Sequence, residues 1–399
     1  MIDICKKEEC TGCYACVNVC PKSCVSMVTD SFGELHPVID QQTCIDCRQC
    51  YNTCPNNRKL SLNRPLSCYA FWLTDSEKRK ECASGGAATA ISEYTISKKK
   101  GVVFGTAYDR TLTAKIFCAK NIEDLARFKG SKYVFSEVGN QTFKEVKSFL
   151  KMGTFVTFIA TPCQIAGLKS FLKKDYDNLL TVDLICHGTA PSCYLSETVS
   201  FLKRKKGLSS LTNIRFRGND GNNYVFTLWD NNRKVYSKKA LFQPYFWAFL
   251  RGLSLRENCY SCKYAKPDRD SDITIGDFIG IGKTVPFKFN AKNVSSLTVN
   301  TDKGKSFVNG LQESTVASRW IERAYEEQLR YAPSLLHPFE KHQKTALFRK
   351  LVAEQGFIKA AEICLKGEIR RNYFLHIINY WTYLYRIPRK VVKIIFYRR

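Results

Sequence analysis

The chain has 399 residues, of which 44% are hydrophobic and 25% charged, with a formal net charge of +26 and 19 cysteines. The length suggests two or three domains, and the composition is that of an ordinary globular protein. An odd number of clustered cysteines argues against a secreted disulfide framework, and no apolar run is long enough to span a membrane. The first ten residues, MIDICKKEEC, contain no apolar signal segment, so we expect a cytoplasmic protein whose thiols bind metal.

The charge is unevenly distributed along the chain. Residues 1–60 hold six Lys or Arg and seven Asp or Glu, a net charge of −1, whereas residues 341–399 hold fourteen against three, a net charge of +11. A basic surface indicates an acidic partner, such as a protein, an anionic coenzyme, a lipid surface or nucleic acid. Because we find no recognition motif of the aromatic-interleaved kind that nucleic-acid modules carry, we do not expect nucleic acid.

Residues 1–60 contain an internal repeat of cysteines. The stretches CTGCYACVNVCP, from Cys10, and CIDCRQCYNTCP, from Cys44, both read C-x2-C-x2-C-x3-C-P and lie 34 residues apart. In two-cluster ferredoxins, three cysteines at this spacing ligate one 4Fe-4S cluster and the fourth ligates the other. The repeat therefore predicts two 4Fe-4S clusters with the ligand sets Cys10, Cys13, Cys16 and Cys54, and Cys44, Cys47, Cys50 and Cys20. Two zinc knuckles are the alternative, although zinc has no use for the third cysteine or the Cys-Pro ending.

Beyond a polar, proline-containing linker at 63–67, strand and helix patterns alternate. We expect strands at 68–73, 101–108, 111–119, 154–160 and 179–186. We expect helices from Ala87, within 121–128, over 141–152, after Cys163 and from Ser192. This alternation predicts a parallel α/β layer, and residues 211–237 read as antiparallel strands with Asn, Asp and Gly turns.

The fold class that follows is mixed α/β, or α+β, in three parts. Residues 1–60 are predicted to form a small ferredoxin-like head, 66–340 a larger α/β body, and 341–399 a basic, aromatic-rich helical tail. Two loops in the body, ASGGAATA (83–90) and KGSKYVFS (129–136), bring main-chain amides together in a way that suits a phosphate or a flat ring. Taken alone, the first loop is more typical of a plain tight turn, and the second is equally compatible with a surface turn.

Cys163 stands between a strand-like run and an amphipathic helix, directly after Pro162. A thiol at a helix N-terminus often has a lowered pKa, so Cys163 is a candidate nucleophile, with His187 and Asp277 as its possible partners.

Three further thiols favour a different role for Cys163. Cys186 also ends a strand, and Cys259 and Cys262 form a C-x2-C pair. Because ligands of open α/β sheets gather at the carboxyl ends of strands, the four thiols are expected to share one crevice. This favours a third metal site over a single nucleophile, with ordinary buried cysteines as the remaining alternative.

Six ordered motifs carry a resemblance to a known family. ASGGAATA, GSKYVFS, ATPCQIAGLKSFL, DLICHG, FWAFLRGLSLRENCYSCKYA and RDSDITIGDF together resemble the coenzyme F420 hydrogenase/dehydrogenase beta-subunit family over about residues 66–310. These proteins are iron–sulfur flavoproteins, so the resemblance implies FAD, a 4Fe-4S cluster in the body and a hydride-exchanging substrate.

The resemblance also implies roles for individual residues. The body-cluster ligands would be Cys163, Cys186, Cys259 and Cys262. The flavin contacts would be Ser84, Gly85, Gly86, Ser131, Lys132, Tyr133, Thr161 and Gln164. His187 is a candidate proton donor at the flavin or a structural neighbour of the cluster.

The expected activity follows from what each cofactor can do. A flavin takes up a two-electron hydride and releases electrons singly, whereas a cluster carries one electron. The resemblance thus implies an oxidoreductase that moves electrons between a hydride donor or acceptor, either coenzyme F420 or another small substrate, and 4Fe-4S clusters via FAD. The alternative is an electron-transfer adaptor subunit without a substrate site of its own. The partner would be a redox protein or the small substrate itself.

Two features stay outside this scheme. For the seven remaining cysteines we expect small buried apolar roles: Cys5, Cys24, Cys68, Cys82, Cys118, Cys193 and Cys364. The tail interleaves Arg and Lys with Trp, Tyr and Ile, so it could pack on the body, dock an acidic protein or lie at the inner membrane surface.

Overall fold

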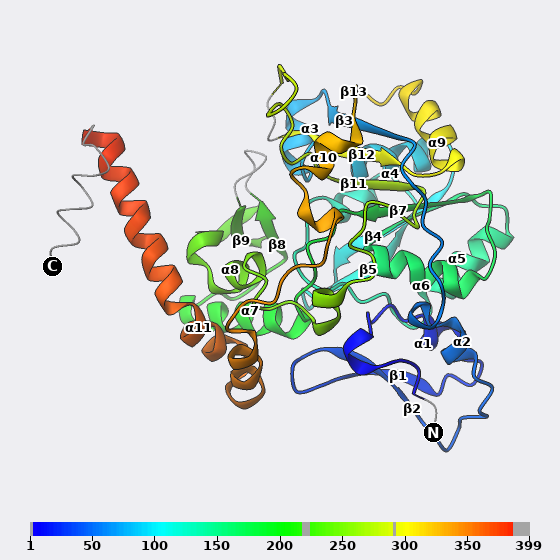
Figure 1. Ribbon diagram of the computed structural model, residues 1–399, viewed down its shortest axis with the longest axis horizontal. Coiled ribbons are helices and arrows are strands. Elements are labelled where there is room, and N and C mark those ends of the chain that lie inside the picture. The colour runs from blue at the N-terminus through cyan, green and yellow to red at the C-terminus, as the bar shows by residue number, and fades with distance from the viewer. Residues whose placement is uncertain (1–2, 218–223, 290–292, 386–399) are drawn as a thin grey trace.

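The computed structural model describes residues 3–217, 224–289 and 293–385 (Figure 1). In Figure 1 the N-terminal head lies beneath a body built on one large sheet, a smaller sheet stands beside that body, and a long C-terminal helix projects away from both. The C-terminal part of the predicted tail, 386–399, lies outside the described residues.

The head consists of one hairpin and two short helices. Strands β1 (Val25–Thr29) and β2 (Leu35–Ile39) pair antiparallel, and helices α1 (Ala15–Val19) and α2 (Gln49–Thr53) contact each other. The two cysteine motifs therefore build two similar helical turns.

The backbone repeats along with the sequence. The residues that precede α1 and α2, Tyr14 and Arg48, both adopt left-handed conformations, with φ of 65° and 56°. Both helices end at the fourth cysteine of their motif, Cys20 or Cys54, in an extended conformation. The two cysteine motifs thus share the same backbone conformation as well as the same spacing.

An eight-stranded sheet forms the centre of the body, in the order β13-β3-β12-β11-β7-β6-β4-β5. Its strands are β3 (Ser67–Leu73), β4 (Val102–Tyr108), β5 (Ala114–Ala119), β6 (Val156–Ala160), β7 (Leu179–Leu184), β11 (Ile273–Asp277), β12 (Ser295–Val299) and β13 (Ser318–Arg323). The neighbours β4, β6, β7 and β11 pair in parallel, and the other pairs are antiparallel. The carboxyl ends of the parallel strands consequently meet at one edge.

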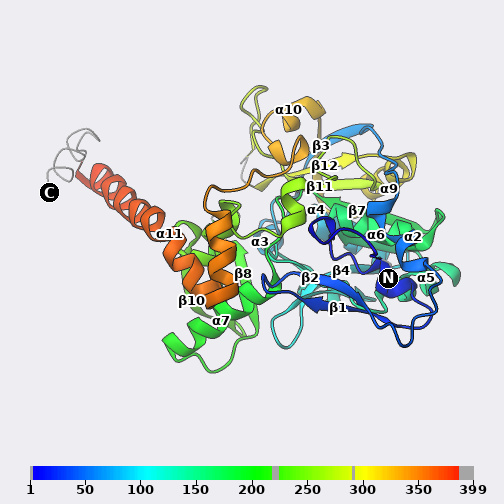
Figure 2. The same cartoon turned by 60° about the horizontal axis from the view of Figure 1, so that its bottom comes forward.

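Helices cover both faces of this sheet. On one face, α5 (Thr142–Lys151) and α6 (Pro162–Leu172) share an apolar core with the head, and on the other α4 (Ala87–Ser97) packs with α9 (Asp302–Gln312). Successive residues of β7 point into different cores, as expected when both faces of a strand are covered. The head therefore sits against the α5–α6 face (Figure 2).

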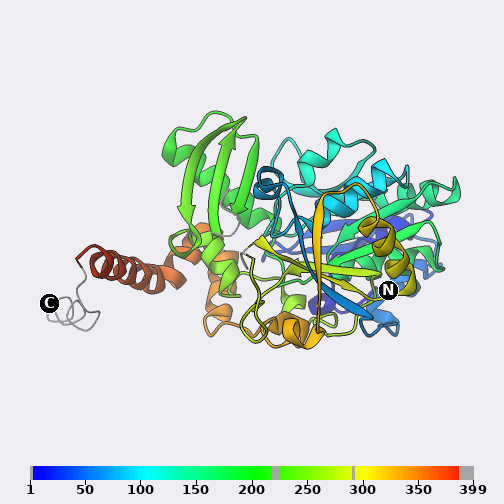
Figure 3. The same cartoon turned by 90° about the horizontal axis from the view of Figure 1, so that it is seen from above.

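A second, three-stranded antiparallel sheet stands beside the first, in the order β10-β9-β8 (Figure 3). Its strands are β8 (Asn213–Arg217), β9 (Tyr224–Asp230) and β10 (Arg233–Lys239). The helices that share its apolar core are α7 (Ser192–Lys206), α8 (Pro244–Leu250) and α11 (Thr345–Tyr385).

Helix α11 is two helices joined at Gly356, whose φ of 79° and ψ of 170° are not helical. The Glu197 carboxylate of α7 accepts hydrogen bonds from the N–H groups of Phe357 and Ile358, so it caps the second helix. Among the described residues, no helix is both long enough and apolar enough to cross a bilayer.

The predicted mixed α/β class is confirmed, with two local corrections. The helix expected after Cys163 begins at Pro162 and includes that cysteine, and the helix expected within 121–128 is the 3-10 helix η3 (Glu123–Phe128). The expectation of burial was wrong for Cys193, which is exposed, and only partly met by Cys5 and Cys118, which are half-buried. The remaining short elements are α3 (Ser76–Glu81), α10 (Tyr325–Leu329), η1 (Lys7–Glu9), η2 (Pro55–Asn57), η4 (Ala240–Phe242), η5 (Glu257–Ser261) and η7 (Pro333–Leu335).

Candidate metal and flavin sites

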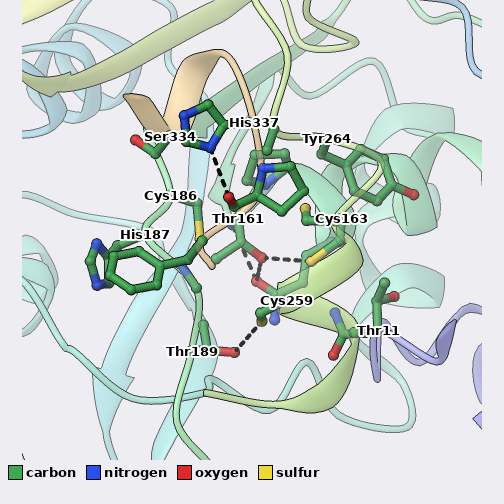
Figure 4. Close-up of a pocket in the computed structure, with 18 of the residues that line it drawn as sticks. Thr11, Thr161, Cys163, Cys186, His187, Thr189, Cys259, Tyr264, Ser334 and His337 are labelled. Atoms are coloured by element: carbon green, nitrogen blue, oxygen red, sulfur yellow. Dashed lines mark hydrogen bonds between the residues drawn. The ribbon is translucent and has the colours of Figure 1, made fainter. Parts of the chain in front are cut away.

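Four thiols from three segments line one cavity of about 380 Å³ at the carboxyl edge of the large sheet (Figure 4). Cys163 lies in the first turn of α6, Cys186 follows β7, and Cys259 and Cys262 lie in and just after η5. We call these four cysteines the body thiol group. The structure brings together the cysteines that the sequence nominated for a third cluster.

The N-terminus of α6 holds Cys163 in place. Thr161 and Gln164 form a capping box, and Pro162 occupies the first helical position, where a missing N–H has no cost. The Thr161 Oγ1 atom lies 3.3 Å from Cys163 Sγ. Two of the predicted flavin contacts, Thr161 and Gln164, therefore line the cavity and also position the thiol.

The loop after β7 positions Cys186 against Cys259. The Gly188 N–H donates to Cys186 Sγ at 3.4 Å, and Thr189 Oγ1 lies 3.9 Å from Cys259 Sγ. Gly188 has a φ of +113°, and a Cβ on it would lie 2.8 Å from Leu255, so this tight turn requires glycine.

None of the four thiols has the lowered pKa of an activated nucleophile. Burial raises the pKa of Cys163 and Cys262, that of Cys186 to about 12 and that of Cys259 to about 11. For Cys163, Cys186 and Cys259 the neighbouring thiols raise it further. A group whose members disfavour each other's ionisation suits ligation to a cationic centre better than nucleophilic attack.

The triad considered for a nucleophilic Cys163 is not assembled. His187 Nε2 lies 3.3 Å from the Phe249 carbonyl oxygen, and burial lowers the pKa of this imidazole. Asp277 forms an ion pair of 2.7 Å with Arg217. His187 does line the cavity, so it stays a candidate for a role at a bound group.

Residues 333–340 form part of the cavity wall, although no motif in the sequence predicted a role for them. Ser334, His337 and Phe339 line the cavity, as does Thr11 of the head. Phe339 fills the space over Gly252, where a Cβ would lie 2.1 Å from its ring, and its ring centroid lies 4.5 Å from that of His187. No local motif marks this segment, because it reaches the site only through the fold.

The loop of Ser84, Gly85 and Gly86 lies at the same edge of the sheet but does not line the cavity. Ser84 Oγ donates to the Val294 carbonyl, and the Gly85 N–H donates to Ser295 Oγ. A Cβ at Gly85 would lie 2.1 Å from the Phe71 carbonyl oxygen, so this glycine is needed for close approach to the sheet.

The second predicted flavin loop, Ser131 to Tyr133, also lies outside the cavity. The Lys132 ammonium donates to main-chain carbonyls, among them those of Phe128 and Lys129, and burial lowers its pKa to about 7. The Tyr133 hydroxyl accepts from Arg217 Nε at 3.0 Å. A 2.6 Å ion pair joins Lys129, at the start of this loop, to Glu81, the last residue of α3.

In the head, one predicted ligand set forms a buried group. Cys10, Cys13, Cys16 and Cys54 line a small cavity and are 7%, 8%, 8% and 7% exposed, and we call them the inner thiol group. Cys5 lines the same cavity, and its thiol hydrogen bonds with Cys10 and Cys54.

The other set, the outer thiol group, is more accessible. Cys20 is buried, Cys44 and Cys50 are half-buried, and Cys47 is exposed. Cys24 adds a thiol 3.4 Å from Cys20 Sγ. In the part of the chain that the structure describes, no three Cys, His, Asp or Glu side chains gather closely enough to bind a single metal ion. A 4Fe-4S cluster does not require this, because each of its ligands binds a different iron.

The inner thiol group touches the body next to the body thiol group. Gly167 of α6 faces Cys13 so closely that a Cβ would lie 2.8 Å from Cys13 Cβ and 2.9 Å from its Sγ. Burial raises the pKa of Tyr264, which lines the body cavity, and the nearby Cys163 and Cys13 raise this pKa further. The inner thiol group therefore packs against α6, the helix that carries Cys163.

Models of known protein families match the chain in three segments. Residues 9–57 match the 4Fe-4S dicluster domain, residues 68–141 the N-terminal domain and residues 154–319 the C-terminal domain of the coenzyme F420 hydrogenase/dehydrogenase beta subunit. These matches and the grouped thiols define an iron–sulfur oxidoreductase of the electron-transferring kind. The chain belongs to the coenzyme F420 hydrogenase/dehydrogenase beta-subunit family, as the six motifs indicated.

Among solved structures, the chain is similar to one chain of the F420-reducing [NiFe] hydrogenase complex from Methanosarcina barkeri, studied by xenon derivatization. The sequence identity is 18%, the TM-score is 0.45, and the alignment covers 76% of this chain and 92% of the other. No curated protein matches the sequence.

Proposed function

We propose that the chain is an iron–sulfur flavoprotein that exchanges a hydride with a small substrate at FAD and single electrons with a redox partner protein. Three 4Fe-4S clusters would be held by the body, inner and outer thiol groups. The observation that carries this proposal is the convergence of four thiols from three segments in a cavity that adjoins the inner thiol group.

The three groups fit clusters in donor chemistry and in number. Each supplies four cysteines, the ligand set of a 4Fe-4S cluster, and such a cluster supplies one-electron transfer when bound. Within the body, Thr161 and Gly188 fix the Sγ atoms of Cys163 and Cys186. The inner group is buried, which keeps water from its thiolates and strengthens electrostatic effects on them, whereas the body thiols are half-buried in the wall of their cavity.

A flavin fits the edge of the sheet between the two glycine-containing loops. No side chain in the described part of the chain caps the N-terminus of α4 at Gly86, so its first N–H groups suit an anionic group such as the flavin diphosphate. The side-chain donors of Ser84 and Lys132 already have protein partners, so main-chain amides are the better candidates for contact. A bound flavin supplies the exchange between a hydride and single electrons.

The proposal is tested by anaerobic reconstitution of the full chain. We expect roughly twelve irons per chain, from three four-iron clusters, together with flavin absorbance that a hydride donor bleaches. Reduced F420, reduced nicotinamides and ferredoxins would be compared as donors. Stoichiometric zinc without iron would contradict the clusters. Reduction by a protein donor alone, with no flavin, would instead favour an adaptor subunit.

The tail has a separate proposed role as a docking segment for an acidic protein or an anionic membrane surface on the cytoplasmic side. Helix α11 exposes Ile363, Leu375 and Ile377 as well as the basic residues Lys366 and Arg370. Sedimentation with anionic liposomes at low and high salt, for the full chain and a chain ending at Gly367, would test the membrane role. Equal and negligible binding by both would leave protein docking or packing.

A further inference from the structure

Arg256 is a fully buried arginine between the head and the body. It immediately precedes η5, its side chain is 1% exposed, and its Nη2 donates to the main-chain carbonyls of Cys10 and Leu35 in the head. Its Nε donates to Asn258 Oδ1, and its guanidinium lies over the Phe135 ring at 4.4 Å. The side chain therefore crosses from the body thiol group to the inner thiol group.

The charge of Arg256 is not neutralised by a carboxylate. Within the described residues no ion pair of 4.0 Å or less includes its guanidinium, and its Nη1 has no hydrogen-bond partner. Arg269 is a useful contrast, because it lines the body cavity and forms a 2.9 Å buried ion pair with Asp183. Burying a charge costs free energy unless a counter-charge or hydrogen bonds compensate it. The guanidinium of Arg256 has no carboxylate partner, so its burial requires an explanation that the burial of Arg269 does not.

Arg256 faces both sets of thiols. Its Nη2 donates to the Cys10 main chain of the inner group, and its own carbonyl accepts from the Cys259 N–H of the body group at 3.0 Å. Asn258, which accepts from its Nε, lines the body cavity. Gly12, between Cys10 and Cys13, provides the room: a Cβ there would lie 3.1 Å from Nη1 and 3.2 Å from Nη2.

We propose that Arg256 is a positioning residue that tunes two clusters at once, raising the reduction potentials of the inner and body 4Fe-4S clusters by supplying one shared positive charge. The proposal rests on the ligand groups proposed above. A cluster with four thiolates is an anion and becomes more negative on reduction, so a nearby cation stabilises the reduced state. Because one charge acts on both clusters, it shifts the two potentials in the same direction.

The test is a redox titration of the reconstituted full chain, followed by EPR. Arg256→Gln should shift the inner and body cluster potentials to more negative values and leave the outer cluster unchanged. Arg256→Lys should keep both potentials close to the wild-type values, because it keeps the positive charge. Arg251→Gln is the matched control: Arg251 is half-exposed and pairs with Glu368, so its loss should shift neither potential. The shifts in Arg256→Gln should persist at high salt, since a buried charge is little screened.

A second variant covers the case in which Arg256→Gln does not assemble its clusters. Asn258→Asp keeps the shape of the side chain that already accepts from Arg256 Nε and neutralises the guanidinium by pairing with it. It should lower both potentials as well.

Unchanged potentials in Arg256→Gln, or in Asn258→Asp if the first variant fails, would overturn the proposal, as would an equal shift in Arg256→Lys and Arg256→Gln. A wild-type protein without a body-cluster signal would instead contradict the proposed ligand group, and the inner cluster would then test Arg256 alone.

Discussion

The inner and outer thiol groups have the same motif and different surroundings. All four inner cysteines are buried against α6 and Arg256, whereas the outer group ranges from the buried Cys20 to the exposed Cys47. The local backbone is the same in both, down to the left-handed residue before each helix. The difference therefore comes from what packs against each motif.

This difference indicates a direction for the electron path within the head. Cys13 of the inner group packs against α6, which carries Cys163 of the body thiol group, whereas the outer group has an exposed thiol, Cys47. Under the proposed function, a redox partner would dock near the outer cluster. The inner cluster would exchange electrons with the body cluster, on the side where the substrate reacts. Four experiments would break or sharpen this comparison.

The largest effect is expected from removing ligands of the body cluster, because the inner cluster then has no neighbouring body cluster with which to exchange electrons. Cys163→Ser and Cys262→Ser should each lose the same cluster, about four irons per chain, while both head clusters keep their EPR signals. Turnover between a hydride donor and the head should be abolished. Cys193→Ser, which changes an exposed thiol outside all three groups, is the control. If Cys163→Ser keeps all its iron yet has no activity, Cys163 is a nucleophile after all.

The contact between the inner group and α6 can be broken without touching a ligand. Gly167→Val places atoms where Cys13 lies, so we expect a loss of about 1–3 kcal/mol in the free energy of unfolding and selective loss of the inner cluster. Gly367→Ala is the control, at a helical glycine whose Cβ would meet nothing within 4 Å. It should leave thermal stability and both head clusters intact. Equal behaviour of the two variants would mean that the head does not depend on this contact.

The difference in exposure predicts an order of cluster loss in the unmodified protein. With a water-soluble iron chelator under oxidising conditions, the outer cluster should be lost before the inner one, because Cys47 is exposed and all four inner cysteines are buried. EPR spectra taken during iron release would separate the two signals. Simultaneous loss, or loss of the inner cluster first, would contradict the assignment of an accessible outer site.

The smallest effect is expected at the cap of α6. Thr161→Ala removes one half of the capping box and should cost about 1 kcal/mol of stability, measured by thermal unfolding. The variant should also loosen Cys163, since Thr161 Oγ1 contacts its Sγ atom. Thr161→Ser keeps the hydroxyl and should behave like the wild type. A stability loss in the serine variant as large as in the alanine variant would point to packing of the methyl group instead.

Much of the fold and part of the site were predictable from the sequence. The alternation of apolar strands and helices predicted the α/β layer, and the cysteine spacing predicted the dicluster head, which the match over residues 9–57 supports. The nucleophile hypothesis for Cys163 arose from local position alone, and it lost support when His187 and Asp277 were found in other contacts.

What the sequence determined by itself is the chemistry that depends on residues close together in the chain. A C-x2-C-x2-C-x3-C-P motif fixes its own backbone turn, so the head could be read locally. Tertiary structure alone decided which thiols are accessible, that 333–340 closes the body cavity and that Arg256 joins two thiol groups. Burial and electrostatic interactions between distant segments arise only when those segments pack together in the fold. Cys10 and Arg256 are far apart in the sequence, so no local pattern predicts their contact.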